Sequence, residues 1–131
     1  WTKGGIGRVL DITNPAQQEW LNKIALLVQP GESLIPSDKT YKQQLSRYQT
    51  QTAQMGLSKL HGLRHAYAQQ RYRELTTAFD RNNRGLISPI EGGKLYKDMT
   101  AYEKSLDRKA RQIITRQLGH SRIAIVKIYI G

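Results

Sequence analysis

The sequence contains no cysteine, and this absence excludes a disulfide framework and thiolate metal sites. Acidic residues are also scarce, since 10 aspartates and glutamates face 21 lysines and arginines. Aromatic residues make up 8% of the chain, which is few for the stacking platforms of a single-strand binder. The longest aliphatic run covers residues 24–28 and is far too short to span a bilayer.

The remaining composition is that of a basic globular chain. Its 131 residues are enough for one domain whose hydrophobic core needs no covalent cross-links. The formal net charge of +11 favours a nucleic acid as partner, because neutralised phosphates release counterions. No membrane partner is expected, since no long basic amphipathic helix stands apart. The absence of thiols fits a cytoplasmic location, and a first residue that is Trp predicts a piece of a longer protein.

The first 30 residues predict a hairpin followed by a helix. Residues 2–12 predict two short strands around a glycine-rich turn, because glycine supplies the positive φ of tight hairpins. Asn14 and Pro15 predict a helix start, as an N-cap and the first helical position. Residues at helical spacing predict one buried stripe on this helix, made of Ala16, Trp20, Ile24 and Leu27.

Two helices and a turn-rich segment are expected next. A polar helix is predicted from about residue 38 to 55, with Gly56 as its stop. Ser58 can cap a further helix that continues to about Leu75. Residues 79–97 are rich in Asn, Gly and Pro and predict turns.

The last third of the chain predicts one long and one short helix. Thr100-Ala-Tyr-Glu103 is a capping-box pattern, and it predicts a helix that ends at Gly119. Ser121 can cap a short helix that runs through Tyr129. The expected class is therefore α+β, mostly helical, with one small N-terminal β-hairpin.

His61 and Arg64 form the first candidate site. They lie three residues apart on a predicted helix and so share one face. A guanidinium binds phosphate oxygens with two hydrogen bonds at once, and a neutral imidazole can accept the proton of an attacking hydroxyl. Most His-x-x-Arg pairs are ordinary surface residues, so this pair gains meaning only together with later residues.

His120 and Tyr129 supply those later residues. Leu118-Gly119-His120-Ser121 places a histidine between a helix stop and a helix start, and a tyrosine hydroxyl can attack phosphorus covalently. Isoleucine neighbours equally favour Tyr129 as a core aromatic. Nine residues at ~100° per residue would place Tyr129 on the helix face opposite position 120. The two side chains can meet only if His120 lies outside the helix.

The order of these residues resembles the tyrosine recombinases, also called phage integrases. Leu60-His61-Gly62-Leu63-Arg64-His65-Ala66-Tyr67 is similar to the family's second box, and Leu118-Gly119-His120-Ser121-Arg122 with Tyr129 is similar to its third box. Thr2-Lys3-Gly4-Gly5 resembles the hairpin that carries the family's lysine.

The resemblance implies site-specific DNA recombination or integration through a 3′-phosphotyrosyl intermediate. Tyr129 would be the nucleophile, His61 would accept its proton, and Lys3 would protonate the leaving oxygen. Arg64 and His120 would hold the phosphate oxygens. Neither metal nor nucleotide cofactor is implied, because the phosphotyrosine conserves the energy of the broken bond.

The chain departs from the family pattern in two places. The first arginine box has no match, so residues 1–131 are expected to be the C-terminal part of a catalytic domain, without that box and without the core-binding domain. Such a fragment is expected to be inactive alone. The segment between Arg64 and His120 is long, which predicts an insertion at about 79–97. The parent would be an integrase of a bacterial mobile element that binds double-stranded DNA as an oligomer.

Two further residues are assigned to DNA. Arg122 is expected to contact the phosphate backbone. His65 follows Arg64 directly and points about 100° away on a helix, which favours packing or a bond to another site residue. Both are taken as candidate DNA-binding residues.

Two other functions fit parts of the sequence. Asp80, Asn82, Gly85 and Glu91 match the spacing of an EF-hand calcium loop, but Arg84 stands at a ligand position, so a polar turn is the favoured interpretation of residues 80–91. A non-catalytic DNA-binding module is the second alternative, because the missing arginine would normally share the developing charge.

Overall fold

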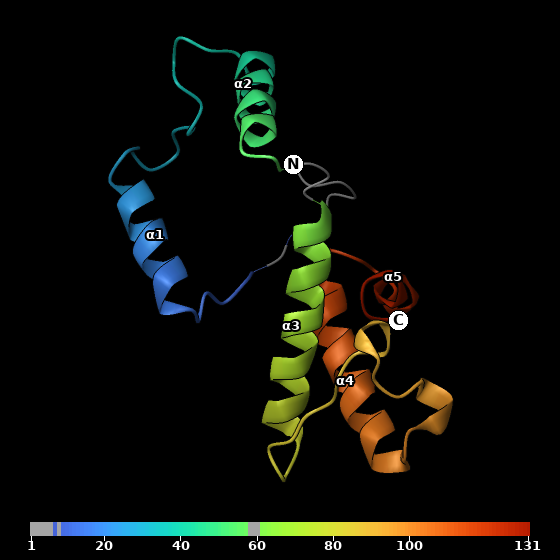
Figure 1. The fold of residues 1–131 in the computed structure, drawn as a ribbon. Helices are drawn as coiled ribbons and strands as arrows, with labels where there is room; N and C mark the ends of the chain where they lie inside the picture. Colours follow the sequence, from blue (N-terminus) through green and yellow to red (C-terminus); the bar gives the residue numbers. More distant parts are fainter. Residues whose placement is uncertain (1–6, 8, 58–60) are drawn as a thin grey trace. The chain divides into compact units, whose positions relative to one another are not determined.

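The computed structural model describes residues 7, 9–57 and 61–131, and it contains five α-helices and three 3₁₀ turns (Figure 1). The α-helices are α1 (Pro15–Ala25), α2 (Tyr41–Gln54), α3 (His61–Phe79), α4 (Ala101–Gln117) and α5 (Lys127–Ile130). The 3₁₀ turns are η1 (Pro89–Glu91), η2 (Tyr96–Asp98) and η3 (Ile123–Val126). The chain divides into two compact units, residues 10–59 and residues 1–9 with 60–131.

The predicted α+β class is wrong, because the described residues contain helices and turns but no strand. Part of the predicted hairpin, including Lys3, lies outside the described residues. Its remaining part, from Val9 to Ile12, is exposed and has no strand partner in the described chain. An isolated two-stranded hairpin is marginal without a buried face, and these residues bury none. In the same described ranges, no helix combines the length and apolar character needed to cross a membrane.

The unit of residues 10–59 holds α1 and α2, and local capping explains where each helix begins. The side chain of Asn14 accepts a hydrogen bond from the N–H of Ala16 at 2.9 Å, as the sequence predicts. Thr40 and Gln43 form a capping box at the start of α2. The predicted buried stripe on α1 is wrong: no residue of α1 is buried, and Trp20 is 67% exposed. Helical spacing indicates that apolar residues share one face of the helix. That face becomes buried only if a second apolar face in the same unit packs against it.

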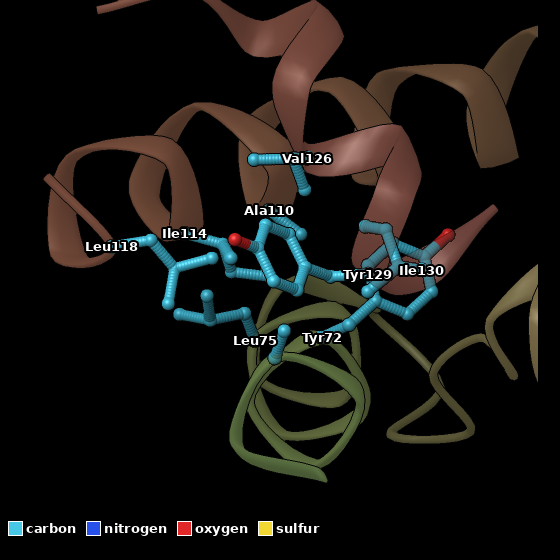
Figure 2. Packing of buried hydrophobic residues seen from close by; sticks show 9 residues of the cluster. Tyr72, Leu75, Ala110, Ile114, Leu118, Val126, Tyr129 and Ile130 are labelled. Atoms are coloured by element: carbon cyan, nitrogen blue, oxygen red, sulfur yellow. The ribbon is translucent and has the colours of Figure 1, made fainter. Parts of the chain in front are cut away.

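The unit that includes residues 61–131 is built on α3 and α4, which lie side by side, with α5 packed against α3 (Figure 1). All three helices contribute to one apolar cluster (Figure 2). Its buried members are Ala68, Tyr72, Leu75, Ala110, Ile114, Leu118, Val126, Tyr129 and Ile130. Tyr129 is thus part of the core as well as a candidate nucleophile, so the core fixes its position.

The turn-rich segment between α3 and α4 is tied to both helices. Thr76 accepts a hydrogen bond from the N–H of Leu86 at 2.9 Å and donates to the carbonyl of Tyr72 at 2.8 Å. The capping box of Thr100 and Glu103 then starts α4, as predicted. Residues 79–97, the expected insertion, therefore belong to the same packed unit as the candidate site.

Candidate functional site

The first turns of α3 present His61, Arg64 and His65 at spacings of three and four residues, which place them on one helix face. The rings of His61 and His65 lie 5.7 Å apart, edge to face. His61 is exposed, whereas Arg64 and His65 are half-buried. His65 has a ring contact with Tyr129, at 4.8 Å between centroids, and its assignment to DNA binding stays a prediction.

His120 is positioned by the turn that ends α4. The N–H of Gly119 donates to the carbonyl of Arg116, and the N–H of His120 donates to that of Thr115, both at 2.9 Å. This pair of bonds is a Schellman motif, and Gly119 has the positive φ of 72° that the motif requires. His120 therefore lies outside the helices, as the sequence predicts for a residue that must reach Tyr129.

The last helix differs slightly from its prediction. Ser121 is not its cap: Arg122 stands at the N-cap position of η3 and makes no side-chain capping bond. The chain turns first through η3 and then through the single turn of α5. Because η3 separates the two residues, Tyr129 is not displaced to the far side of a continuous helix from His120.

Tyr129 is the point where these side chains converge. The centroid of its ring lies 5.8 Å from that of His120 and 6.1 Å from that of His61. The guanidinium carbon of Arg64 lies 5.7 Å from the same centroid. Figure 2 shows the Tyr129 ring extending toward Leu118, at the end of α4. The structure thus brings together His61, Arg64, His65, His120 and Tyr129, which come from three separate segments.

Arg64 links the two histidine-bearing segments. Its guanidinium donates to the main-chain carbonyl of Leu118 and lies 3.3 Å from Nε2 of His120. Its Nε is buried and has no hydrogen-bond partner among the described residues. Buried donors normally have partners, so Arg64 is under-satisfied at this nitrogen.

Two predicted site residues lie outside this group. Lys3 falls outside the described residues, so its relation to Tyr129 is not described. Arg122 is exposed and forms no ion pair within the described chain. A phosphate-backbone contact therefore remains the prediction for Arg122.

The main chain of α5 is anchored from both long helices. Gln69 on α3 donates to the main-chain oxygen of Tyr129 at 3.2 Å. Arg111 on α4 donates to the main-chain oxygen of Gly131 at 2.7 Å. Gly131 has a φ of 88°, and a Cβ there would lie only 2.8 Å from Cβ of Pro89. These contacts fix the short segment that carries Tyr129.

Asp107 supports these anchors, and the sequence interpretation missed it. Its buried carboxylate accepts from the Tyr72 hydroxyl at 2.8 Å and from Nε of Arg111 at 2.8 and 2.9 Å. Burial raises the pKa of Tyr72, and the hydrogen bond to Asp107 adds to this shift. The only sequence signal was the four-residue spacing of Asp107 and Arg111, which is common on exposed helix faces.

The EF-hand-like segment forms a polar turn. Asp80 accepts main-chain hydrogen bonds from Asn82, Arg84 and Gly85 at 3.2, 3.0 and 3.3 Å. The N–H of Asn82 is the largest cause of a lowered Asp80 pKa. Glu91 pairs with Arg73 at 2.7 Å. Both carboxylates therefore hold the turn together, and no group of three His, Cys, Asp or Glu residues among the described residues is arranged to hold a metal.

Comparison of the chain with family models, with curated proteins and with solved structures found no match. The residues that converge on Tyr129 and the charge of the chain are therefore the features that bear on its function.

Proposed function

We propose that this chain is part of an enzyme that breaks and rejoins DNA strands through a covalent bond to Tyr129. The observation that supports the proposal is the convergence of one arginine and three histidines around a single tyrosine. Such groups bind, polarise and protonate phosphate oxygens, and a tyrosine oxygen can attack phosphorus. The positive charge of the chain suits the same substrate.

The proposed reaction exchanges one phosphoester for another. The Tyr129 hydroxyl oxygen attacks the scissile phosphorus, and His61 accepts its proton. A 3′-phosphotyrosyl bond forms while the bond between phosphorus and the 5′-oxygen breaks. Lys3 gives the leaving 5′-oxygen its proton, and attack by a 5′-hydroxyl of another strand reverses the sequence.

Arg64 and His120 are proposed to stabilise the charge that develops on the non-bridging oxygens. Their separation of 3.3 Å allows both to contact one phosphate. The Nε of Arg64 is a further donor without a partner, and it could reach a phosphate oxygen only if the side chain shifts, because it is buried. This division of roles assigns proton transfer to His61 and charge stabilisation to Arg64 and His120.

The burial of Tyr129 determines how the substrate would approach. Tyr129 is 5% exposed, and its neighbours Arg64, His65 and His120 are half-buried. His61 is the exposed member of the group. We therefore infer that the phosphodiester enters past His61, and that the enclosed ring protects the phosphotyrosyl bond from water.

The proposed enzyme is a site-specific recombinase or integrase of a bacterial mobile element, acting on double-stranded DNA in the cytoplasm. A first arginine box and a core-binding domain would complete this enzyme, and residues 1–131 match neither. Pairing of two DNA sites requires more than one copy, so the longer protein would assemble as an oligomer on DNA.

The test is covalent capture of a nicked DNA substrate, from which the cleaved strand end diffuses away. The protein used should be the longest natural form that contains residues 1–131. We expect an adduct that survives denaturant, and Tyr129→Phe should reduce it at least about 10³-fold, since phenylalanine has no nucleophile. DNA binding by Tyr129→Phe should change less than about twofold, because its hydroxyl is one small contact in an electrostatic interface.

Tyr48→Phe is the matched control, because it removes a hydroxyl from an exposed tyrosine on α2. Its adduct should equal that of the unaltered protein. Undiminished adduct in Tyr129→Phe would refute the assignment of the nucleophile. Binding without any adduct in the unaltered protein would instead favour the non-catalytic DNA-binding module.

A further inference from the structure

A concave site lies in the unit that includes residues 61–131, and it shares no lining residue with the group around Tyr129. It is a pocket of about 500 Å³ bordered by α4, η2, η3 and the end of α5. Clefts of a few hundred Å³ are the usual size for small-molecule sites. Three lining residues, Asp107, Arg111 and Gly131, anchor the segment that carries Tyr129, and the other lining residues have no role in the site described above.

The charge of the pocket is positive. Its lining includes four cationic side chains, those of Lys97, Arg108, Arg111 and Lys127. The acid in the lining is Asp107, whose carboxylate is already bonded by Arg111 and Tyr72. Lys97, Arg108 and Lys127 are exposed and form no ion pair within the described chain. An occupant that carries a negative charge would therefore find unpaired cations.

The rest of the lining is largely apolar. Pro89, Leu95 and Ile123 border the pocket, and Leu95 and Ile123 are 52% and 39% exposed. An occupant with an apolar body would remove these surfaces from water. A phosphate backbone offers no such body, so a DNA strand matches the cations but not the apolar lining.

We propose that this pocket binds a small organic anion: an aromatic or aliphatic body that carries a carboxylate, sulfonate or phosphate group. The apolar body packs against Leu95 and Ile123, and the anionic group pairs with Arg108 and its neighbouring lysines. This binding is independent of the reaction proposed for Tyr129, so either proposal can fail without the other.

The experiment is a titration of the full chain, followed by the amide signals of a ¹H–¹⁵N NMR spectrum. The probe is 1-naphthalenesulfonate, and the matched neutral compound is 1-naphthalenesulfonamide. We expect saturable shifts confined to amides around the pocket, such as those of Ile123 and Ala124. The neutral compound should bind at least about tenfold more weakly, because it lacks the charge-assisted bonds.

Two variants and one control complete the test. Arg108→Gln should weaken the sulfonate at least about fivefold and leave the neutral compound unchanged. Ala124→Trp should fill the pocket and abolish binding of both compounds. Arg116→Gln removes an exposed cation from the same helix but outside the pocket, and it should bind as the unaltered chain does.

Several results would overturn the proposal. Equal affinity for the charged and neutral compounds would show that the cationic side chains do not contribute to binding. Unchanged binding of the sulfonate by Arg108→Gln would show the same. Shifts spread over α1 and α2 would indicate non-specific adsorption to their exposed apolar residues. Pocket signals that shift with protein concentration alone would show that a second copy of the chain occupies the site.

Discussion

The position of Tyr129 depends on a buried carboxylate that never touches it. Asp107 joins Tyr72 to Arg111, and Arg111 reaches the main-chain oxygen of Gly131. Gln69 supports the same segment from α3. A buried carboxylate is costly unless it is fully paired, and here one charge orders residues from α3, α4 and the end of α5.

Removal of this carboxylate is expected to destabilise the protein. Asp107→Ala should lower the free energy of unfolding by about 3 kcal/mol, because it leaves the Tyr72 hydroxyl and the Arg111 guanidinium without their buried partner. Urea unfolding followed by circular dichroism measures the change. Asp98→Ala, an exposed aspartate on η2, is the control and should change stability by less than about 0.5 kcal/mol. Equal stability of the two variants would contradict a structural role for Asp107.

Strong local signals allowed the position of single residues to be predicted from the sequence. Gly119 marks the end of α4 by its conformation, so the position of His120 outside the helix could be predicted and is confirmed. Asp107 could not be found in this way, because its partner Tyr72 lies 35 residues away and only tertiary packing joins them. The catalytic roles of the converging residues stay predictions.

At the element scale, caps were better guides than patterns of apolar residues. Asn14, Thr40 and Thr100 each cap a helix, and the N-caps at Asn14 and Thr100 were predicted because a cap is a contact between near neighbours. The stripe with Trp20 and the strands from residue 2 to 12 failed as predictions. Both needed a distant partner that the sequence pattern does not specify, and the described residues supply none.

The turn that joins α3 to the following loop is expected to respond to acid. Hydrogen bonds, led by that from Asn82, lower the pKa of Asp80 below its ordinary value of 3.8. The native state therefore favours the ionised form, and this stabilisation is complete above the ordinary pKa and is lost as the pH falls through the native pKa.

Asp80→Asn should remove that pH-dependent stability. The variant should melt at a lower temperature than the unaltered chain at pH 7, and the two melting temperatures should approach each other as the pH falls through the lowered native pKa of Asp80 and the carboxyl becomes protonated. Thermal unfolding from pH 7 to pH 2 measures both curves. Asp11→Asn, at an exposed residue without a hydrogen bond among the described residues, is the control. A constant difference between Asp80→Asn and the unaltered chain across this range would contradict the argument.

At the scale of the whole molecule, charge and site are distributed differently. The net charge of +11 belongs to the full chain, whereas the described residues around Tyr129 all belong to the unit that includes residues 61–131. Under the proposed function, long-range attraction to DNA and chemistry at one phosphate would therefore be separable. Salt should weaken the attraction to DNA without changing the geometry of the residues around Tyr129.

Affinity for duplex DNA is expected to fall steeply with salt. If six or more phosphates are neutralised, affinity should drop roughly 10³-fold between 50 and 200 mM salt. Fluorescence anisotropy of labelled duplexes measures this. Arg122→Gln should weaken binding by a similar factor for unrelated sequences and reduce the logarithmic salt slope by about one. Affinity that does not change with salt would contradict an electrostatic interface. An unchanged salt slope in Arg122→Gln would show that Arg122 does not contact the DNA backbone.

The helix that carries Tyr129, α5, is four residues long, and its position must be stabilised by the rest of the unit. A single helical turn is not stable by itself in water, because the conformational entropy lost in nucleating it outweighs the free energy gained from its hydrogen bonds. The orientation of the Tyr129 side chain therefore depends on α3 and α4. These two helices are long and share one core, which gives them the rigidity that α5 lacks. The placement of the Tyr129 oxygen is therefore determined by the two long helices and not by the short helix that carries it.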